Sequence, residues 1–474
     1  MTELSADSIG WLSILPPIIA ILLAIWTKQV FISLFMGVWL GWSILDSHPL
    51  SGLADALQCC IDVFKDGGNT KVIAFSSLVG ALIAFTQRSG GVQGFVTWLS
   101  RNGLVSSRRS AGLMAYLIGV AVFVESSITC LVTGTVSRPI FDRLKISREK
   151  LAYICDSTSA PICILIPLNG WGAYVMGLLA AQEVEQPFLT VIKSLPFNLY
   201  AILALLILLM VILTGKDIGP MRRAEKRAFE QGKVLRDGAE PVVSTELLAL
   251  QPKAGVSARA SNMLIPVAVM VVMMPVGLLI TGHGHLMQGS GSTSVFWAVL
   301  AATTAAGILY KIQGIMDLKE QVDLLLKGIG GMMPLALLMM LAFAIGATCK
   351  ELGTGPYVAG VAETWLSPRL VPAILFVVSG FMAFSTGTSW GTFAIMIPIG
   401  IPLVNLMDAN LYVTVGAILS GGIFGDHCSP ISDTTIIASM ASVSDHIDHV
   451  RTQFPYALIA AGGALLAYLA LGTV

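Results

Sequence analysis

Apolar segments free of charged residues recur along the chain, and most are long enough to cross a lipid bilayer as helices. They run about 15 to 21 residues each, close to the length that an α-helix needs to cross roughly 30 Å of hydrocarbon. The pattern therefore predicts an all-α polytopic membrane protein. These segments are residues 9–26, 30–45, 72–86, 195–215, 262–281, 292–310, 329–348 and 454–474.

Two other apolar stretches are interrupted by small polar residues and predict re-entrant hairpins. In residues 110–137 the arms on either side of Glu125 are too short to span the bilayer. A hairpin also keeps the basic residues at its two ends on one side of the membrane, as the positive-inside rule prefers. We predict its counterpart at residues 370–404, entering from the opposite side.

Three motifs of the first half return in the second half, in the same order and at nearly constant separation. This repetition predicts two inverted repeats, each with five transmembrane helices, one of them broken, and one re-entrant hairpin. We expect the repeats at residues 1–215 and 261–474, with broken helices at 148–180 and 411–443. The motif pairs are 98–100 with 365–367, 123–127 with 384–388, and 156–162 with 426–431.

The long polar stretch at residues 216–260 is rich in Lys, Arg, Glu and Gly and predicts a linker between the repeats. Placing it in the cytoplasm also places most of the 28 lysines and arginines there. Both termini are then extracytoplasmic, in a bacterial inner membrane. No basic region precedes the first apolar segment, so we expect that segment to remain as a membrane helix.

The composition agrees with a membrane protein and narrows the function classes. Hydrophobic residues make up 55% of the chain and charged residues 12%, with a mean hydropathy of +0.80. The net charge is zero, which does not favour nucleic-acid binding. The seven cysteines have no metal-site spacing, and no hydrolase or protease motif lies in the membrane. We expect no enzyme activity and no cofactor.

Four carboxylates fall in the interrupted stretches: Glu125, Asp156, Asp426 and Asp433. An acid inside the membrane is costly and indicates a functional site. Such an acid can hold either a proton or a sodium ion, and we predict Na+ at Asp156, Asp426 and Asp433. Hydroxyls and unwound backbone would supply further oxygen ligands. The predicted ion or substrate ligands are Ser126, Ser127, Ser157, Thr158, Thr386, Gly387, Thr388, Ser389, Ser429 and Thr434.

Each of these polar residues also has a structural interpretation. Asp156 or Asp426 could cap the half-helix that follows it, and Glu125 could face cytoplasmic water. His427 is either a proton carrier or a hydrogen-bonded structural histidine. We interpret residues 445–449, with two aspartates and two histidines, as a solvated polar turn, with a pH sensor as the alternative.

Two of these motifs resemble the NhaC-type Na+/H+ antiporter family. Residues 425–435 match its G-D-x-x-S-P-x-S-D-T-T segment, and residues 385–392 resemble its hairpin-tip motif. The resemblance covers most of the chain from Phe75 onward. It implies an ion-transporter fold that pairs a scaffold domain with a mobile transport domain, a homodimer, and an elevator motion. It also implies cation coupling more firmly than any one substrate, because the family includes sodium-coupled malate/lactate exchangers.

The leading hypothesis is a Na+/H+ antiporter that works by alternating access, with membrane lipid, Na+ and H+ as its partners. The alternative is a Na+- or H+-coupled carrier of a small organic metabolite, either a carboxylate or an amino acid. No Lys or Arg lies in the four motif stretches, which disfavours a dicarboxylate. An intramembrane enzyme and a channel are less well supported, since inverted repeats with broken helices are typical of alternating access.

Overall fold

The computed structural model describes residues 9–27, 29–100, 107–123, 125–241, 253, 255–285, 289–354, 357, 361 and 367–471. Within these ranges the chain is helical, apart from turns and one isolated bridge between Pro241 and Asp445. Trp365 and Leu366 of the repeated motif and part of the 216–260 linker lie outside the described residues.

The helices up to residue 231 form an ordered series that ends in the linker. The elements are η1 (Gly10–Ile14), α2 (Leu15–Thr27), α3 (Val30–Leu45), α4 (Pro49–Asp62), η2 (Val63–Lys65), α5 (Gly67–Arg88), α6 (Gly91–Ser100), α7 (Arg108–Ala121), α8 (Ser126–Arg143), α9 (Arg148–Ser157), α10 (Ala160–Leu165), α11 (Gly170–Ala181), α12 (Pro187–Ser194), η3 (Leu195–Phe197), α13 (Leu199–Thr214) and α14 (Gly219–Gln231).

The second series begins after the linker. Its elements are α15 (Ser261–Thr281), α16 (Gly291–Ile312), α17 (Leu318–Glu351), η5 (Pro368–Leu370), α19 (Val371–Thr386), α20 (Ser389–Met407), α21 (Leu411–Cys428), α22 (Asp433–Ser442) and α23 (His446–Leu471).

Eight helices in the described part are long and apolar enough to cross a membrane, and nine if the bent pair α9–α10 and α11 is one span. This confirms an all-α polytopic protein. The helices differ in one respect from the predicted list. α2 and α3 fall below the length of a full span, whereas α19 and α20, the arms of the predicted second hairpin, reach it. Length alone therefore does not separate hairpin arms from spans.

Local sequence explains where the helices begin and end. Asn169 and Asn410 cap α11 and α21 by accepting hydrogen bonds from two backbone N–H groups each. Gly215 ends α13 in the left-handed conformation, with φ of +68°. The predicted linker therefore begins where the apolar helix α13 ends, and the next apolar helix, α15, begins at Ser261.

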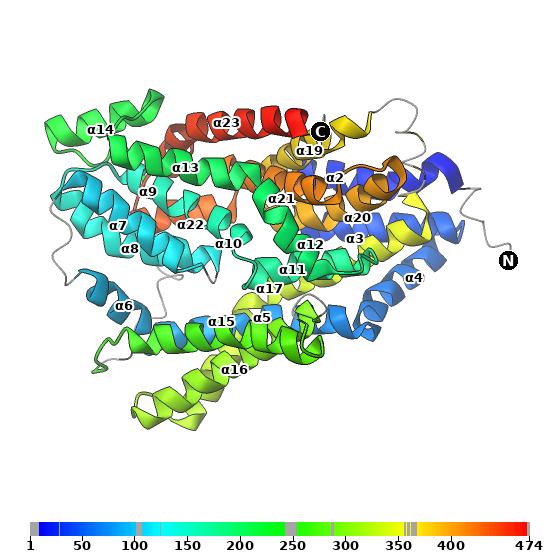
Figure 1. Cartoon of the computed structure of the whole chain (residues 1–474), viewed down its shortest axis with the longest axis horizontal. Coiled ribbons are helices and arrows are strands. Elements are labelled where there is room, and N and C mark those ends of the chain that lie inside the picture. The colour runs from blue at the N-terminus through cyan, green and yellow to red at the C-terminus, as the bar shows by residue number, and fades with distance from the viewer. Residues whose placement is uncertain are drawn as a thin grey trace.

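The helices pack in two regions (Figure 1). α5 packs along α17, and α15 packs along α16 at one edge of the molecule. α7, α8, α9, α22 and α14 gather at the end opposite the N-terminus. There α8 contacts both α9 and α22, so the arm of the first hairpin touches both broken helices. α19 packs along α21, and α20 lies against both.

The linker is docked on α7, α9 and the start of α23. Glu225 of α14 accepts hydrogen bonds from Arg108 and from the Ser147 backbone, 2.5 and 2.8 Å away. Beyond α14, Arg236 pairs with Asp448 at the start of α23, at 2.7 Å. The predicted linker thus connects the ends of helices from both halves of the sequence.

Candidate functional site

Two broken helices form the centre of the site. α9 ends at Ser157 and α10 begins at Ala160, and a second break follows at residues 166–169. α21 ends at Cys428 and α22 begins at Asp433, with residues 429–432 between them. Helix interruption at this depth leaves backbone groups to be satisfied by neighbouring polar side chains or by an ion.

Asp426 lies in the last turn of α21 and is 1% exposed. Its Oδ2 accepts hydrogen bonds from the Ser389 hydroxyl at 2.6 Å and from the Ser389 backbone N–H at 3.2 Å. Its Oδ1 accepts one from the Ser432 hydroxyl at 2.6 Å. Within the described ranges no Lys or Arg contacts this carboxylate, so its charge is held by neutral donors.

Asp156 occupies the equivalent place in α9, one residue before the helix ends, and is fully buried. Its Oδ2 accepts hydrogen bonds from the Thr435 hydroxyl at 2.9 Å and from the Gln453 side-chain amide at 2.7 Å. The Nε2 atom of His449 lies 3.8 Å from the same oxygen. The carboxylate is thus enclosed by side chains of α22 and α23.

The break between α21 and α22 links the two acids. Ser432 binds Asp426 and Thr435 binds Asp156, only three residues apart in the chain. Gln453 adds a second link, because its amide donates to both Asp156 and the backbone carbonyl of His427. The two carboxylates are therefore held in part by neighbouring residues of one short segment.

Neither aspartate caps the half-helix that follows it. The N-cap positions of α10 and α22 are Ser159 and Ser432, so the capping interpretation is wrong for both acids. Each acid instead lies at a helix C-terminus, where the unpaired carbonyls and the negative end of the helix dipole attract a cation.

The turn between α19 and α20, the tip of the predicted second hairpin, packs directly on the α21–α22 break. Gly387 ends α19 with φ of +69°, and a Cβ atom built on it would lie 2.5 Å from the carbonyl oxygen of Ile431. The Ser429 hydroxyl donates to the carbonyl of Phe384 at 2.6 Å. The close contact explains why the tip has glycine at this position. The same packing places Ser389 beside Asp426.

The first hairpin tip contacts the second break of the other broken helix. Glu125 lies between α7 and α8, is half-buried, and accepts a hydrogen bond from Ser126 at 3.2 Å. The Asn169 amide donates to the carbonyl of Phe123 at 2.9 Å.

The remaining predicted ligands divide into four sets. Ser157 is hydrogen-bonded to His427 and Thr434 to Ser432, close to the acids. Thr158 and Thr386 instead donate to backbone carbonyls of their own helices, at 2.7 and 3.0 Å. Thr388 holds the N-cap position of α20 without a side-chain cap. The side chains of Ser127 and Asp433 lie outside the described part of the structure, so their predicted roles stay predictions.

His427 is a buried, hydrogen-bonded histidine. Its Nε2 is 2.9 Å from the Ser157 hydroxyl, and its Nδ1 is 2.6 Å from the Tyr200 hydroxyl. Both ring nitrogens are therefore held by neutral partners. This geometry fits the structural interpretation and ties α9 and α13 to α21.

The interpretation of residues 445–449 as a solvated turn is only partly correct, because Ile447 is 63% exposed whereas Asp445 and His449 are buried. His449 is fully buried, with Nε2 2.9 Å from Gln453 Oε1 and Nδ1 2.8 Å from the Ser439 hydroxyl. Asp445 is 9% exposed and accepts the Glu240 backbone N–H. The burial arises because α22 and the docked linker cover this turn.

Sequence reasoning did not assign roles to Thr435 or Gln453, and it did not connect His449 with the carboxylates. Thr435 lies within the motif at residues 425–435, so the motif could have included it. Gln453 and His449 are four residues apart at the start of α23 and so share one helix face. Two polar residues on one face beside an apolar segment were a usable signal.

Among the described residues no group of three His, Cys, Asp or Glu side chains is placed to hold a metal ion. The oxygen donors near the acids are two carboxylates, the hydroxyls of Ser389, Ser432 and Thr435, and the ends of two half-helices. Oxygen ligands of this kind suit a hard cation such as Na+.

Comparison with known proteins places the chain among cation antiporters. The family model described as "Na+/H+ antiporter family" matches residues 180–473. An uncharacterized protein of Haemophilus influenzae is 31% identical over 97% of this chain and 90% of its own length.

Two further likenesses are more limited. The arginine/ornithine antiporter ArcD of Halobacterium salinarum is 30% identical over 44% of this chain and 41% of its own length. Among solved structures, the YdaH transporter of Alcanivorax borkumensis has a TM-score of 0.61 at 12% identity, over 94% of this chain and 97% of that chain. This last likeness concerns the fold alone.

Proposed function

Because this chain belongs to the Na+/H+ antiporter family, we propose that it exchanges Na+ for protons across the membrane and that Asp426 and Asp156 carry the coupling. In this proposal each carboxylate holds either a proton or a share of one sodium ion. Competition between the two for the same oxygens is sufficient for exchange, because the ion can load only where the proton has left.

One observation carries this proposal. Two buried acids, one from each half of the sequence, lie at the C-terminal ends of interrupted helices and are linked through a single chain break. A half-helix C-terminus directs carbonyl oxygens and a negative dipole toward a cation. The neutral donors around Asp426 stabilise its charged form without competing with Na+ as a lysine or arginine would.

The remaining motif residues have supporting roles in the proposal. Ser389, Ser432 and Thr435 supply hydroxyl oxygens that can turn from the carboxylate to the ion. Asp433 stands at the start of α22, beside this set, and is proposed as a further ligand. The proposed role of Glu125 is at the entrance, since its tip contacts the second break near Asn169.

For the movement that exposes the site, we propose two inverted repeats and an elevator motion in a homodimer. The body formed by α7–α10, α13 and α19–α23 would move, and the body formed by α5 and α15–α17 would stay fixed. The packing of α5 on α17 and of α15 on α16 supports such a fixed body. The proposed setting is a bacterial inner membrane, with α14 on the cytoplasmic side and both termini outside.

A second candidate is a cation-coupled carrier of a small organic metabolite. It is favoured by the partial likeness to a protein named as an arginine/ornithine antiporter and by the half-buried Glu125 at a hairpin tip, which could pair with an amine. In this candidate Asp426 and Asp156 would hold the coupling ion, and Glu125 the substrate.

The test is made on protein reconstituted in liposomes with an imposed pH gradient. NaCl, LiCl or KCl is added and a fluorescent dye reports the internal pH. The proposal expects NaCl to collapse the gradient in wild type, and neither NaCl nor LiCl to do so in Asp426→Asn. Asp408→Asn, which removes an exposed acid at the end of α20, is the matched control and should behave as wild type. A gradient that responds only when arginine, ornithine or malate is added would favour the second candidate.

A further inference from the structure

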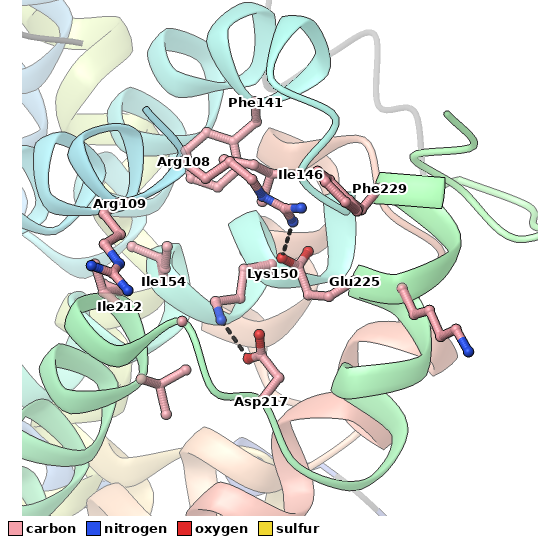
Figure 2. Close-up of a pocket in the computed structure, with 14 residues that line it drawn as sticks. Arg108, Arg109, Phe141, Ile146, Lys150, Ile154, Ile212, Asp217, Glu225 and Phe229 are labelled. Carbon is pink, nitrogen blue, oxygen red and sulfur yellow. Dashed lines mark hydrogen bonds and ion pairs between the residues drawn. The ribbon is translucent and has the colours of Figure 1, made fainter. Parts of the chain in front are cut away.

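A cavity of about 440 Å³ lies where α7, α8, α9, α13 and α14 meet (Figure 2). Its lining includes neither Asp156 nor Asp426, so it is separate from the proposed ion site. It is located at the end of the molecule that holds α14, the proposed cytoplasmic end.

The cavity has an apolar wall. Side chains of α8, α9 and α13, including Phe141, Ile154 and Ile212, line it together with Ile146. α13 is itself one of the most apolar helices of the chain and ends at Thr214, next to the cavity. An apolar wall at the end of a membrane helix is suited to a hydrocarbon chain.

The rim of the cavity carries more positive than negative charge. Four basic residues, Arg108, Arg109, Lys150 and Lys226, face two acidic ones, Asp217 and Glu225. Two of the basic residues are neutralised within the fold, because Arg108 pairs with Glu225 at 2.5 Å and Lys150 pairs with Asp217.

Arg109 and Lys226 make no ion pair with any described residue, and both are exposed. Figure 2 shows the Arg109 guanidinium beside Ile212, away from the Arg108–Glu225 pair. Arg109 belongs to α7 and Lys226 to α14. The unpaired charge therefore comes from the hairpin on one side and from the linker on the other.

We propose that this cavity binds the headgroup of an anionic phospholipid, with the phosphate at the rim that carries the unpaired charges of Arg109 and Lys226 and the start of an acyl chain against the apolar wall. Guanidinium and ammonium groups both bind phosphate oxygens with charge-assisted hydrogen bonds. Basic pockets between membrane helices on the cytoplasmic side are suited to acidic lipid headgroups. The inference goes beyond the proposed function and does not depend on which ion is carried.

The test measures lipid binding to the full chain in detergent by native mass spectrometry. The added probes are dioleoylphosphatidylglycerol, dioleoylphosphatidylcholine and sn-glycerol 3-phosphate. The variant is Arg109→Gln/Lys226→Gln, which leaves the Arg108–Glu225 and Lys150–Asp217 ion pairs in place. The control is Arg222→Gln/Lys319→Gln, which removes equal charge from exposed residues that do not line the cavity.

We expect phosphatidylglycerol to bind wild type and control with equal affinity. Binding to Arg109→Gln/Lys226→Gln should be about 30-fold weaker, from the loss of two charges beside the headgroup. As a second readout, phosphatidylglycerol should raise the thermal midpoint of wild type and control but not of the variant. Equal binding of phosphatidylcholine, or unchanged binding by the variant, would overturn the proposal. Binding of glycerol phosphate as tight as that of the lipid would assign the cavity to a soluble phosphate instead.

Discussion

Replacing Gly387 by alanine should damage the site while leaving the fold in place. Gly387 has φ of +69°, and an added Cβ would lie 2.5 Å from the carbonyl oxygen of Ile431. The left-handed conformation costs an alanine roughly 1 to 2 kcal/mol, partly offset by the lower entropy of its unfolded chain. The backbone contact adds about 1 to 3 kcal/mol, typical of overpacking, for a total of about 3 kcal/mol.

Two other glycines separate these contributions. Gly215 has nearly the same φ, +68°, and nothing within 4 Å of a built Cβ, so Gly215→Ala carries only the conformational cost. Gly462 lies in α23 at an ordinary φ and also has open space, so Gly462→Ala should be neutral or slightly stabilising. The thermal midpoints in detergent should therefore fall in the order Gly462→Ala, Gly215→Ala, Gly387→Ala.

The functional readout is the sodium concentration that gives half-maximal exchange in liposomes. Ile431 lies in the break between α21 and α22, next to Ser432, whose hydroxyl donates to Asp426. Relief of the contact must displace this break, so Gly387→Ala should require about tenfold more sodium. Gly215→Ala should leave the sodium requirement unchanged. If Gly387→Ala matches Gly215→Ala in both measurements, the packing of the hairpin tip on the break does not support the ion site.

Three further predictions follow from buried groups. Lys150→Met should lower the free energy of unfolding by about 3 kcal/mol, because the side chains of the Lys150–Asp217 pair are only 7% and 6% exposed. Lys150→Met/Asp217→Leu should recover most of the loss in thermal midpoint. A double variant no more stable than the single one would contradict this. Burial of Asp445 works to raise the pKa of its carboxyl, but backbone N–H groups, including those of Glu240 and Asp448, outweigh it and hold that pKa below its usual value. Its stabilising contribution should therefore be present above the unfolded pKa of about 4 and be lost as the pH falls through the lower folded value. Wild type should exceed Asp445→Asn in thermal midpoint at pH 7 and lose this advantage as the pH falls through that folded value. Gln453→Leu removes the hydrogen-bond donor to Asp156 and to the His427 carbonyl. It should lower the rate of sodium-driven exchange by about tenfold or more. Exchange at the wild-type rate would show that Gln453 does not support the site.

Local features of the sequence predicted much of the fold. Charge-free runs of adequate length give the helices, and the Ser, Thr, Gly and Pro residues around Asp156 and Asp426 mark the interruptions at residues 158–159 and 429–432. These signals are informative because a membrane helix forms its backbone hydrogen bonds internally. Where the helix is interrupted, nearby polar residues must supply the missing hydrogen bonds.

Contacts between distant segments could not be predicted in the same way. The contacts of buried His449 include Ser439 of α22 and Asp156 of α9, and the Gln453 contact with Asp156 joins residues 297 positions apart in the chain. The docking of residues 232–241 on Asp445 has no local signature either, because a polar, charged segment is equally consistent with a solvated linker. The predicted hairpin arms α19 and α20 likewise have the length and composition of spans, so neither property distinguishes the two.

The most direct test of the central claim is the number of protons released when sodium binds to the purified protein. In weakly buffered detergent solution, NaCl is titrated into wild type, Asp426→Asn and the control Asp408→Asn, while a pH electrode and a calorimeter record protons and heat. If Na+ and H+ compete for the same carboxylates, wild type and control release protons as sodium binds, and the sodium affinity rises with pH. Asp426→Asn should then release none. Sodium binding without proton release in wild type, or unchanged release in Asp426→Asn, would contradict the account.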